Sequence, residues 1–222
     1  NRNVMTDIDI YNYLGQFVIT TKAQLALQHG YGDGLELSCE RTVKAVSNLF
    51  YGIPIHGYCA VNYVAIPTIN DLAGGVTVTL LDDFTFFDKS MVKGSTLKLS
   101  GKQAFKYVQY RDTKMFNSVA VRMERIKQYL MSLVNALKGK MKSDITIPAK
   151  LYEAISPYMV TNISLDEIIY LASEALSYEI DIEQFYSLEG ETKQGELYEE
   201  FYADEDYLYD LIIELFYKQV NQ

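Results

Sequence analysis

The chain has 222 residues, and its 20 basic residues against 29 acidic ones give a formal net charge of −9. Nucleic acid binding relies on a basic surface, so this charge opposes nucleic acid as a general partner. Hydrophobic residues make up 49% of the chain, which is enough for a core of ordinary size. No run approaches the roughly 20 apolar residues of a membrane span, and Cys39 and Cys59 have no metal-ligand spacing.

Helical and strand-like patterns alternate along the first half of the chain. Pro67 lies in the first turn of an expected helix, and Ser100 caps another. The β-branched run VTVTLL is typical of a buried strand. The expected helices are 22–30, 39–52, 66–73 and 101–110, and the expected strands are 57–63 and 76–81.

The second half is expected to be mainly helical. A long helix is predicted over 118–138, with a core stripe that includes Val134 and Leu137. A strand with a turn is expected over 178–190. The residues that open or cap the remaining helices are Pro148, Ser164 with its capping-box partner Glu167, and Asp204.

The alternation of strands and helices predicts an α/β fold. We expect a mixed central sheet sandwiched by helices, followed by a mainly helical C-terminal region. Residues 1–142 are expected to form the main domain, and residues 143–222 a C-terminal extension packed on the same domain.

The stretch YVQYRDTKMFNSVAVRMERIKQYL concentrates arginines in an acidic chain. Arg122 and Arg125 lie near the start of the long helix, where a cation opposes the helix dipole by roughly 0.3–1 kcal/mol. A bound anion removes this cost, because helix N-termini offer free N–H groups and arginine grips phosphate oxygens bidentately. Arg111 can converge from the other side of the loop. The alternative is that these arginines pair with acidic neighbours, such as Glu124, or face water.

Three further stretches carry a resemblance to a known family, in the order NDLAGGVTVTL, KGSTLKLSGKQAFKYVQYR and RMERIKQYL. They resemble the Asp-x-x-Gly-Gly-Val, Leu-x-Gly-x-x-Ala, Tyr-Val-Arg-x-Arg and Arg-x-x-Arg-Gln motifs of the LytR-CpsA-Psr (LCP) family. Arg2 and the residues after it are similar to the family's Pro-Arg-Asp-Thr motif, and the C-terminal 60 residues or so resemble those of clostridial members. The matched positions are Asp71, Gly74, Gly75, Val76, Leu99, Gly101, Ala104, 107–111, Arg122 and Arg125.

The resemblance implies a phosphotransferase of the Firmicutes type that acts in cell-wall biogenesis. Such a protein is expected at the extracytoplasmic face of the cell membrane, held by an N-terminal anchor in a front part that this chain lacks. Its implied reaction attaches an anionic glycopolymer, such as teichoic acid or capsular polysaccharide, from a polyprenyl-pyrophosphate carrier to peptidoglycan. Mg²⁺ is the implied cofactor, although no metal ligand and no catalytic residue can be named in this chain.

The site residues follow from the same resemblance. Arg2, Arg111, Arg122 and Arg125 match positions that bind phosphate in the family. The stripe that continues from Arg122 through Ile126, Leu130 and Leu133 is then expected to face an apolar pocket for the lipid tail. The alternative for this stripe is a closed core.

Several positions depart from the family pattern. Gln109 replaces the first arginine of the Arg-x-Arg pair, Asn3 and Val4 replace Asp and Thr, and Ile126 replaces Gln. No carboxylate occurs over 117–121, where the family has one. Two alternatives therefore stay open: a homologue that binds polyprenyl phosphates without turnover, and a cell-envelope-related transcriptional regulator or attenuator.

Weaker candidates have structural explanations. Asp82 and Asp83 suit a turn, and Asp71 before the glycine pair suits a turn as well. The glycines at 30, 32 and 34 lack the Lys-Ser/Thr that follows a phosphate-binding loop, so they predict a turn. The two histidines are isolated in the sequence, which favours structural or surface roles.

Overall fold

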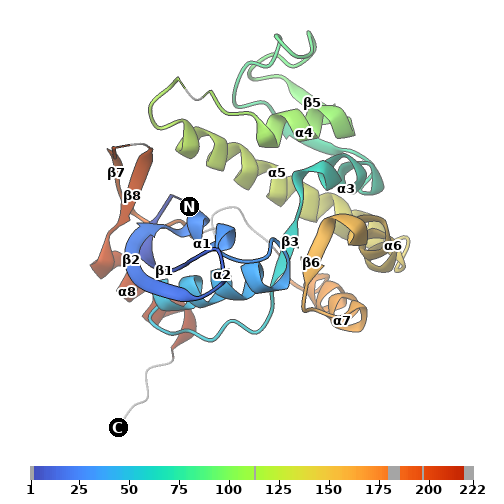
Figure 1. The fold of residues 1–222 in the computed structure, drawn as a ribbon. Coiled ribbons are helices and arrows are strands. Elements are labelled where there is room, and N and C mark those ends of the chain that lie inside the picture. Colours follow the sequence, from blue (N-terminus) through green and yellow to red (C-terminus); the bar gives the residue numbers. More distant parts are fainter. Residues whose placement is uncertain (1–2, 113, 180–185, 197, 218–222) are drawn as a thin grey trace. The chain divides into compact units, whose positions relative to one another are not determined.

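The computed structural model describes residues 3–112, 114–179, 186–196 and 198–217. The chain forms two compact units (Figure 1). Unit 1 combines residues 1–58 with 186–222, and unit 2 comprises residues 59–185. Neither boundary coincides with the expected division at residue 142, because residues 143–185 pack within unit 2 and the last part of the chain packs with the first.

Unit 1 contains two antiparallel strand pairs. Strands β1 (Met5–Tyr11) and β2 (Phe17–Gln24) form a hairpin, and β7 (Gly190–Gln194) pairs with β8 (Glu199–Ala203). A parallel bridge between Val4 and Phe201 joins the two pairs. Residues from opposite ends of the sequence therefore share one layer of unit 1.

Three helices complete the described part of unit 1: α1 (Leu25–Gly30), α2 (Glu36–Leu49) and α8 (Glu205–Phe216). The expected cap of α8 is confirmed, because the Asp204 side chain accepts a hydrogen bond from the Tyr207 backbone N–H at 3.0 Å. Helix α8 buries Leu208, Leu211 and Ile212 and leaves Phe216 exposed. The apolar face of α8 is thus buried over its first two turns only.

Unit 2 is built around one long helix, α5 (Ser118–Met141), which is contacted by β4, α4 and α6 (Figure 1). The other helices are η1 (Tyr63–Ala65), α3 (Ile66–Leu72), α4 (Gly101–Gln109), α6 (Ile147–Ile155), η2 (Ser156–Tyr158) and α7 (Leu165–Ala175). The strands form two antiparallel pairs: β3 (Cys59–Val61) with β6 (Met159–Thr161), and β4 (Val76–Thr79) with β5 (Thr96–Leu99).

The core of unit 2 lies between the β4–β5 pair and helices α4 and α5. Val76 and Val78 point into it, whereas Thr77 and Thr79 are exposed. The strand expected to be buried on both faces is therefore half-buried, as is common in an antiparallel pair with one solvated face. Residues of the core cluster are Ala73, Val76, Val78, Leu80, Phe84, Met91, Leu99, Ala104, Tyr107, Val108, Tyr129 and Leu133.

The glycine-pair motif forms a tight turn around a buried asparagine. Gly74 and Gly75 have φ values of 82° and 86°, a region that side chains with a Cβ rarely adopt. The Asn70 side chain donates to the Leu99 carbonyl at 2.9 Å and accepts from the Val76 N–H at 3.2 Å, which joins α3 to β4 and β5. Asp71 lies 3.2 Å from the same amide nitrogen. The turn interpretation of Asp71 agrees with this geometry.

The α/β class predicted from the sequence is confirmed. Within the described residues, the sheets are two-stranded antiparallel pairs, and the bridge in unit 1 is the parallel element of the mixed arrangement. The capping boxes of α4 (Ser100 with Gln103) and α7 (Ser164 with Glu167) are both formed. Of the strand expected over 178–190, residues 180–185 lie outside the described part, and the described residues on either side form no strand before β7 begins at Gly190.

Candidate functional site

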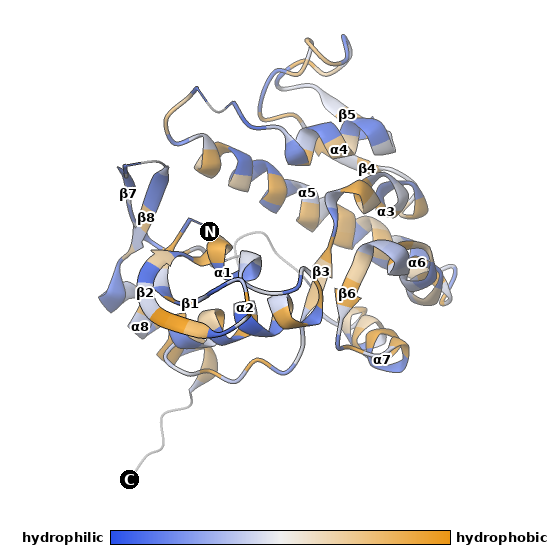
Figure 2. Cartoon of the chain, in the orientation of Figure 1, coloured by the Kyte–Doolittle hydropathy of each residue, from blue (hydrophilic) through white to orange (hydrophobic). Residues whose placement is uncertain are grey.

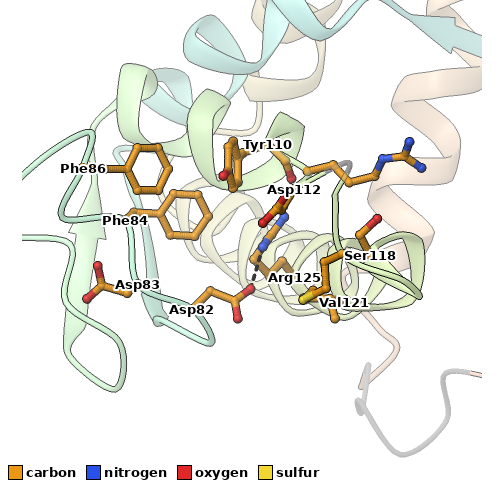
Figure 3. A pocket seen from close by; sticks show the side chains of 11 residues that line it. Asp82, Asp83, Phe84, Phe86, Tyr110, Asp112, Ser118, Val121 and Arg125 are labelled. Atoms are coloured by element: carbon orange, nitrogen blue, oxygen red, sulfur yellow. Dashed lines mark hydrogen bonds and ion pairs between the residues drawn. The ribbon is translucent and has the colours of Figure 1, made fainter.

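A cavity of about 360 Å³ opens in unit 2 beside the start of α5 (Figure 3). Three segments build it: the loop after β4, the residues that follow α4, and the first turns of α5. We call it the polar cavity. Its lining residues are Asp82, Asp83, Phe84, Phe86, Tyr110, Arg111, Asp112, Met115, Ser118, Val121 and Arg125.

Arg125 forms the inner wall of the polar cavity and is only 3% exposed. Its Nε donates to the Tyr107 carbonyl at 3.1 Å, and one terminal nitrogen donates to the Tyr110 carbonyl. The other terminal nitrogen lies 2.6 Å from an Asp82 carboxylate oxygen (dashed in Figure 3). Its guanidinium is therefore engaged on three sides by protein oxygens.

The position of Arg125 follows from the end of α4. The last carbonyls of a helix have no partner within the helix, and a cation there complements the negative end of the dipole. Arg125 meets this need from the neighbouring helix, so its charge is balanced by the C-terminus of α4 and by Asp82. The dipole cost at the start of α5, which motivated the anion prediction, is offset in part by protein groups.

Tyr107 ties the same three segments together. Its hydroxyl accepts from the Leu81 N–H at 3.2 Å and donates to the Gln128 side-chain oxygen at 2.7 Å. Burial raises the pKa of this phenol above its ordinary value, so it stays protonated and keeps both bonds. The loop after β4 is thereby fixed against α4 and α5.

Charge is nearly balanced in the polar cavity. Asp82 neutralises Arg125, which leaves Arg111 with Asp83 and Asp112 on the lining. Hydrogen bonds from the side chain and backbone of Thr85 lower the pKa of Asp83, so its carboxylate is charged at neutral pH. Among the described residues, Arg111 forms no ion pair with a carboxylate. Its guanidinium is therefore the positive charge on the lining that Asp82 does not neutralise.

An aromatic cluster makes the opposite wall (Figure 3). The rings of Phe84 and Phe86 are stacked with centroids 5.7 Å apart, and Tyr110 lies 5.0 Å from Phe86 and 5.6 Å from Phe84. The Lys106 ammonium lies over Phe86 and Tyr110. Arg125 packs its guanidinium 5.2 Å from the Phe84 ring, which links the charged and aromatic walls.

Comparisons with known proteins identify the family. The family model described as LytR_cpsA_psr matches residues 1–211. The chain belongs to the LytR-CpsA-Psr family. Membership supports cell-wall glycopolymer transfer, at the cell envelope, as the activity at the level of the family.

Solved LCP structures share the fold. TagU of B. subtilis has 20% identity and a TM-score of 0.63, with 100% of this chain and 85% of that chain covered. Protein gbs0355 of Streptococcus agalactiae has 20% identity and a TM-score of 0.74, with coverage of 100% and 75%. TagT, in a structure described as bound to LI-WTA, has 20% identity and a TM-score of 0.70, with coverage of 96% and 74%. No curated protein matches the chain.

The LCP arginine positions are brought together in part. Arg111 and Arg125 line the same cavity, although they come from different elements. Arg122 is buried on α5 and is not among the lining residues. Arg2 lies outside the described residues, so its convergence with the others stays a prediction.

The stripe predicted to hold a lipid tail is packed differently. Leu133 belongs to the core cluster, Ile126 packs against it, and Leu130 is 42% exposed. The buried face of α5 runs through Arg125, Tyr129 and Leu133, at helical spacings of four. Leu130 is rotated about 100° from Tyr129 and therefore points to solvent. None of the three predicted residues lines the polar cavity or the groove described next.

A second hollow has the apolar chemistry that the stripe lacks. A groove of about 300 Å³ lies between β3, the C-terminal half of α5, α6, β6 and α7, and many residues of these helices are orange in Figure 2. We call it the apolar groove. It is lined by Cys59, Leu137, Met141, Ile147, Pro148, Leu151, Tyr152, Ile155, Met159, Ile163, Ile168 and Ala172. Sequence reasoning missed it because its walls come from five segments.

The described residues do not fit a dedicated Mg²⁺ site. Among them, no group of three or more His, Cys, Asp or Glu side chains is placed to hold a metal ion. In the polar cavity Asp82 is engaged by Arg125, and Asp83 accepts bonds from Thr85. Nor is any described helix both long and apolar enough to cross a membrane.

Proposed function

We propose that this chain is a transferase that moves an anionic glycopolymer from a polyprenyl-pyrophosphate carrier to peptidoglycan. It would work at the extracytoplasmic face of the membrane, held by an anchor outside the chain described here. The observation that carries the proposal is the polar cavity, which joins Arg111 to Arg125 at positions that match family motifs. Mg²⁺ is proposed from the family alone, and no step is assigned to it.

Arg111 is assigned to bind the pyrophosphate. It is half-buried on the cavity lining, and a guanidinium in a partly dehydrated site interacts with phosphate more strongly than in water. The first turn of α5 holds no acidic residue, and Ser118 at its start lines the cavity. The Ala120 and Val121 N–H groups donate to the Asn117 carbonyl, so a bound anion would engage the N–H groups of Ser118 and Val119.

Arg125 is assigned a positioning role. Its three partners hold the end of α4 and the loop after β4 in place, so it shapes the wall against which the phosphate rests. Phosphoryl transfer depends mainly on such positioning and on charge stabilisation. Loss of Arg125 would therefore damage the cavity even without a direct contact to ligand.

The apolar groove is proposed as the seat of the carrier's hydrocarbon tail. It begins at Leu137, about 18 Å along α5 from Arg125 at 1.5 Å per residue. A polyprenyl chain is long enough to run from one hollow to the other along this helix. The groove replaces the stripe at Ile126, Leu130 and Leu133 as the place for the tail.

Calorimetric titration with farnesyl pyrophosphate tests the assignment of Arg111. Arg111→Ala should weaken binding about tenfold or more, since a hydrogen bond to a charged group contributes about 1.5–3 kcal/mol. Lys114→Ala is the matched control, because it removes an exposed cation from the same loop outside the lining. If both variants lose the same affinity for farnesyl pyrophosphate, Arg111 acts only through its general positive charge, and this result counts against the proposal.

A binding protein without turnover is the second candidate. It is favoured by Gln109 in place of an arginine and by the missing metal-ligand group among the described residues. Release of polyprenyl monophosphate from a lipid-linked glycopolymer in the presence of peptidoglycan separates the two. Transfer breaks the pyrophosphate bond and passes the glycopolymer with its phosphate to the acceptor hydroxyl, whereas a binder forms the complex but gives no product. The regulator alternative is tested by DNA binding across salt concentrations, and the net charge of −9 opposes it.

A further inference from the structure

We propose that Phe86 and Tyr110 form a stacking platform for a sugar ring, so that the polar cavity binds a pyranose unit beside the phosphate. This inference rests on the proposed function, because it names the part of the ligand that the arginines do not explain. It assigns Phe86 as a residue that determines affinity for the sugar and not for the phosphate.

The platform is exposed but held in place. Phe86 is 59% exposed, while Phe84 beneath it is fully buried. Stacking on Phe84 fixes the plane of the Phe86 ring, and Phe84 is itself packed 5.4 Å from Tyr107. Tyr110 continues the surface at 5.0 Å. The Lys106 ammonium lies 5.5 Å from the Phe86 centroid and 4.8 Å from the Tyr110 centroid, so a sugar ring that stacks there displaces this side chain. A large apolar ring kept in a fixed orientation toward solvent, at the wall of a cavity, is suited to an incoming apolar face.

Polar groups surround the platform in the arrangement that a sugar requires. A pyranose ring presents C–H groups on its faces and hydroxyl groups around its rim. The C–H groups carry partial positive charge and are attracted to the negative face of an aromatic ring. The hydroxyl groups can donate to Asp83 and Asp112 and accept from Arg111, all of which line the cavity.

Phosphate alone does not account for this wall. Once Asp82 and Arg125 neutralise each other, the remaining lining charges are two carboxylates and one guanidinium. An anion is attracted to Arg111 but repelled by the two carboxylates. A neutral polyhydroxyl ring is not repelled by either kind of charge. The cavity volume of about 360 Å³ lies at the lower end of the roughly 300–1,000 Å³ that ligand pockets occupy, which suits one or two sugar rings.

Titration with neutral trisaccharides, followed by NMR, tests the platform directly. The probes are the trimers of N-acetylglucosamine, glucose and galactose, and at least one should bind to the unaltered protein. Phe86→Ala should weaken that binding about tenfold, and Phe86→Tyr should retain it. Phe87→Ala is the matched control, because Phe87 is 45% exposed on the same loop and near the same Lys106, yet does not line the cavity. It should change the affinity less than twofold.

A second titration with inorganic pyrophosphate separates this inference from the proposed function. Phe86→Ala should leave pyrophosphate binding unchanged, while Arg111→Ala should weaken it. If pyrophosphate binds through Arg111 but none of the three sugars binds, the platform is wrong and the proposed function stands. The platform is also wrong if Phe86→Ala weakens sugar and pyrophosphate equally, or if Phe87→Ala matches Phe86→Ala. If neither pyrophosphate nor sugar binds, both proposals fall.

Discussion

The two halves of α5 lie beside two different hollows. The first half buries Arg125 and lines the polar cavity, whereas the second half places Leu137 and Met141 in the apolar groove. Burial of a charge is tolerated in the first half because the end of α4 supplies carbonyls and Asp82 supplies a carboxylate. The second half instead meets mainly apolar side chains of α6 and α7, such as Leu151 and Ile168, in the groove. The chemistry of each hollow is thus set by what the neighbouring segments present to the same helix.

The largest effect is expected from Arg125→Met, which removes the charge but keeps much of the side-chain volume. It leaves Asp82 and the Tyr107 carbonyl without their partner, and such a loss from a buried pair costs about 3–5 kcal/mol. Thermal and urea unfolding measure it. Lys114→Met, on the exposed loop, should stay within about 0.5 kcal/mol. A loss below about 1 kcal/mol for Arg125→Met would show that the polar half does not depend on this arginine.

A smaller effect is expected from Leu133→Ala, which should lower the free energy of unfolding by about 2–4 kcal/mol. The reason is that Leu133 lies in the core cluster, on the buried face of α5. Leu130→Ala is its control on the same helix and should cost about 0.5 kcal/mol, because Leu130 is largely in solvent. If the two variants lose comparable unfolding free energy in urea, Leu130 is buried with Leu133, as the sequence-based prediction of the stripe had it.

The smallest effect concerns pH and the turn that leads from α5 into α6, beside the apolar groove. Hydrogen bonds from the Lys150 and Thr146 side chains lower the pKa of Asp144 from 3.8 to about 2. Since the folded pKa is depressed, this stabilisation is complete above pH 3.8 and is lost as the pH falls through 2. Asp144→Asn should therefore lower the melting temperature slightly at pH 5. Melting curves should converge near pH 2, and a difference that persists there would contradict the assignment.

Local signals in the sequence were sufficient for most helix starts. Ser100, Ser164 and Asp204 cap helices as predicted, because a cap depends on residues within one turn. The buried face of α5 was not predictable in the same way. The assumed stripe followed the aliphatic residues, whereas the real one passes through Arg125 and Tyr129, which find polar partners from α4 and α3.

The candidate site was predicted only where the family motifs reach. Arg111 and Arg125 were found through their match to the motifs, and the structure brings them to one cavity. Asp82 was given a turn role, and Phe86 was not considered, because both lie on a loop whose approach to α4 and α5 depends on contacts distant in sequence. The division expected at residue 142 also could not anticipate contacts between residues distant in sequence, because unit 1 combines the two ends of the chain.

Helix α4 is held in place by close contacts at both of its ends. At one end Gly101 lies so close to α3 that a Cβ built on it would be 2.8 Å from the Pro67 Cα. At the other end, Arg125 donates hydrogen bonds to the Tyr107 and Tyr110 carbonyls. The nine residues of α4 span about 13 Å between the two ends. A methyl group added at position 101 would push α4 away from α3. Because a short helix moves as a rigid body, its C-terminal end would be displaced as well. Gly101→Ala would thus tilt the aromatic wall of a cavity that position 101 never touches.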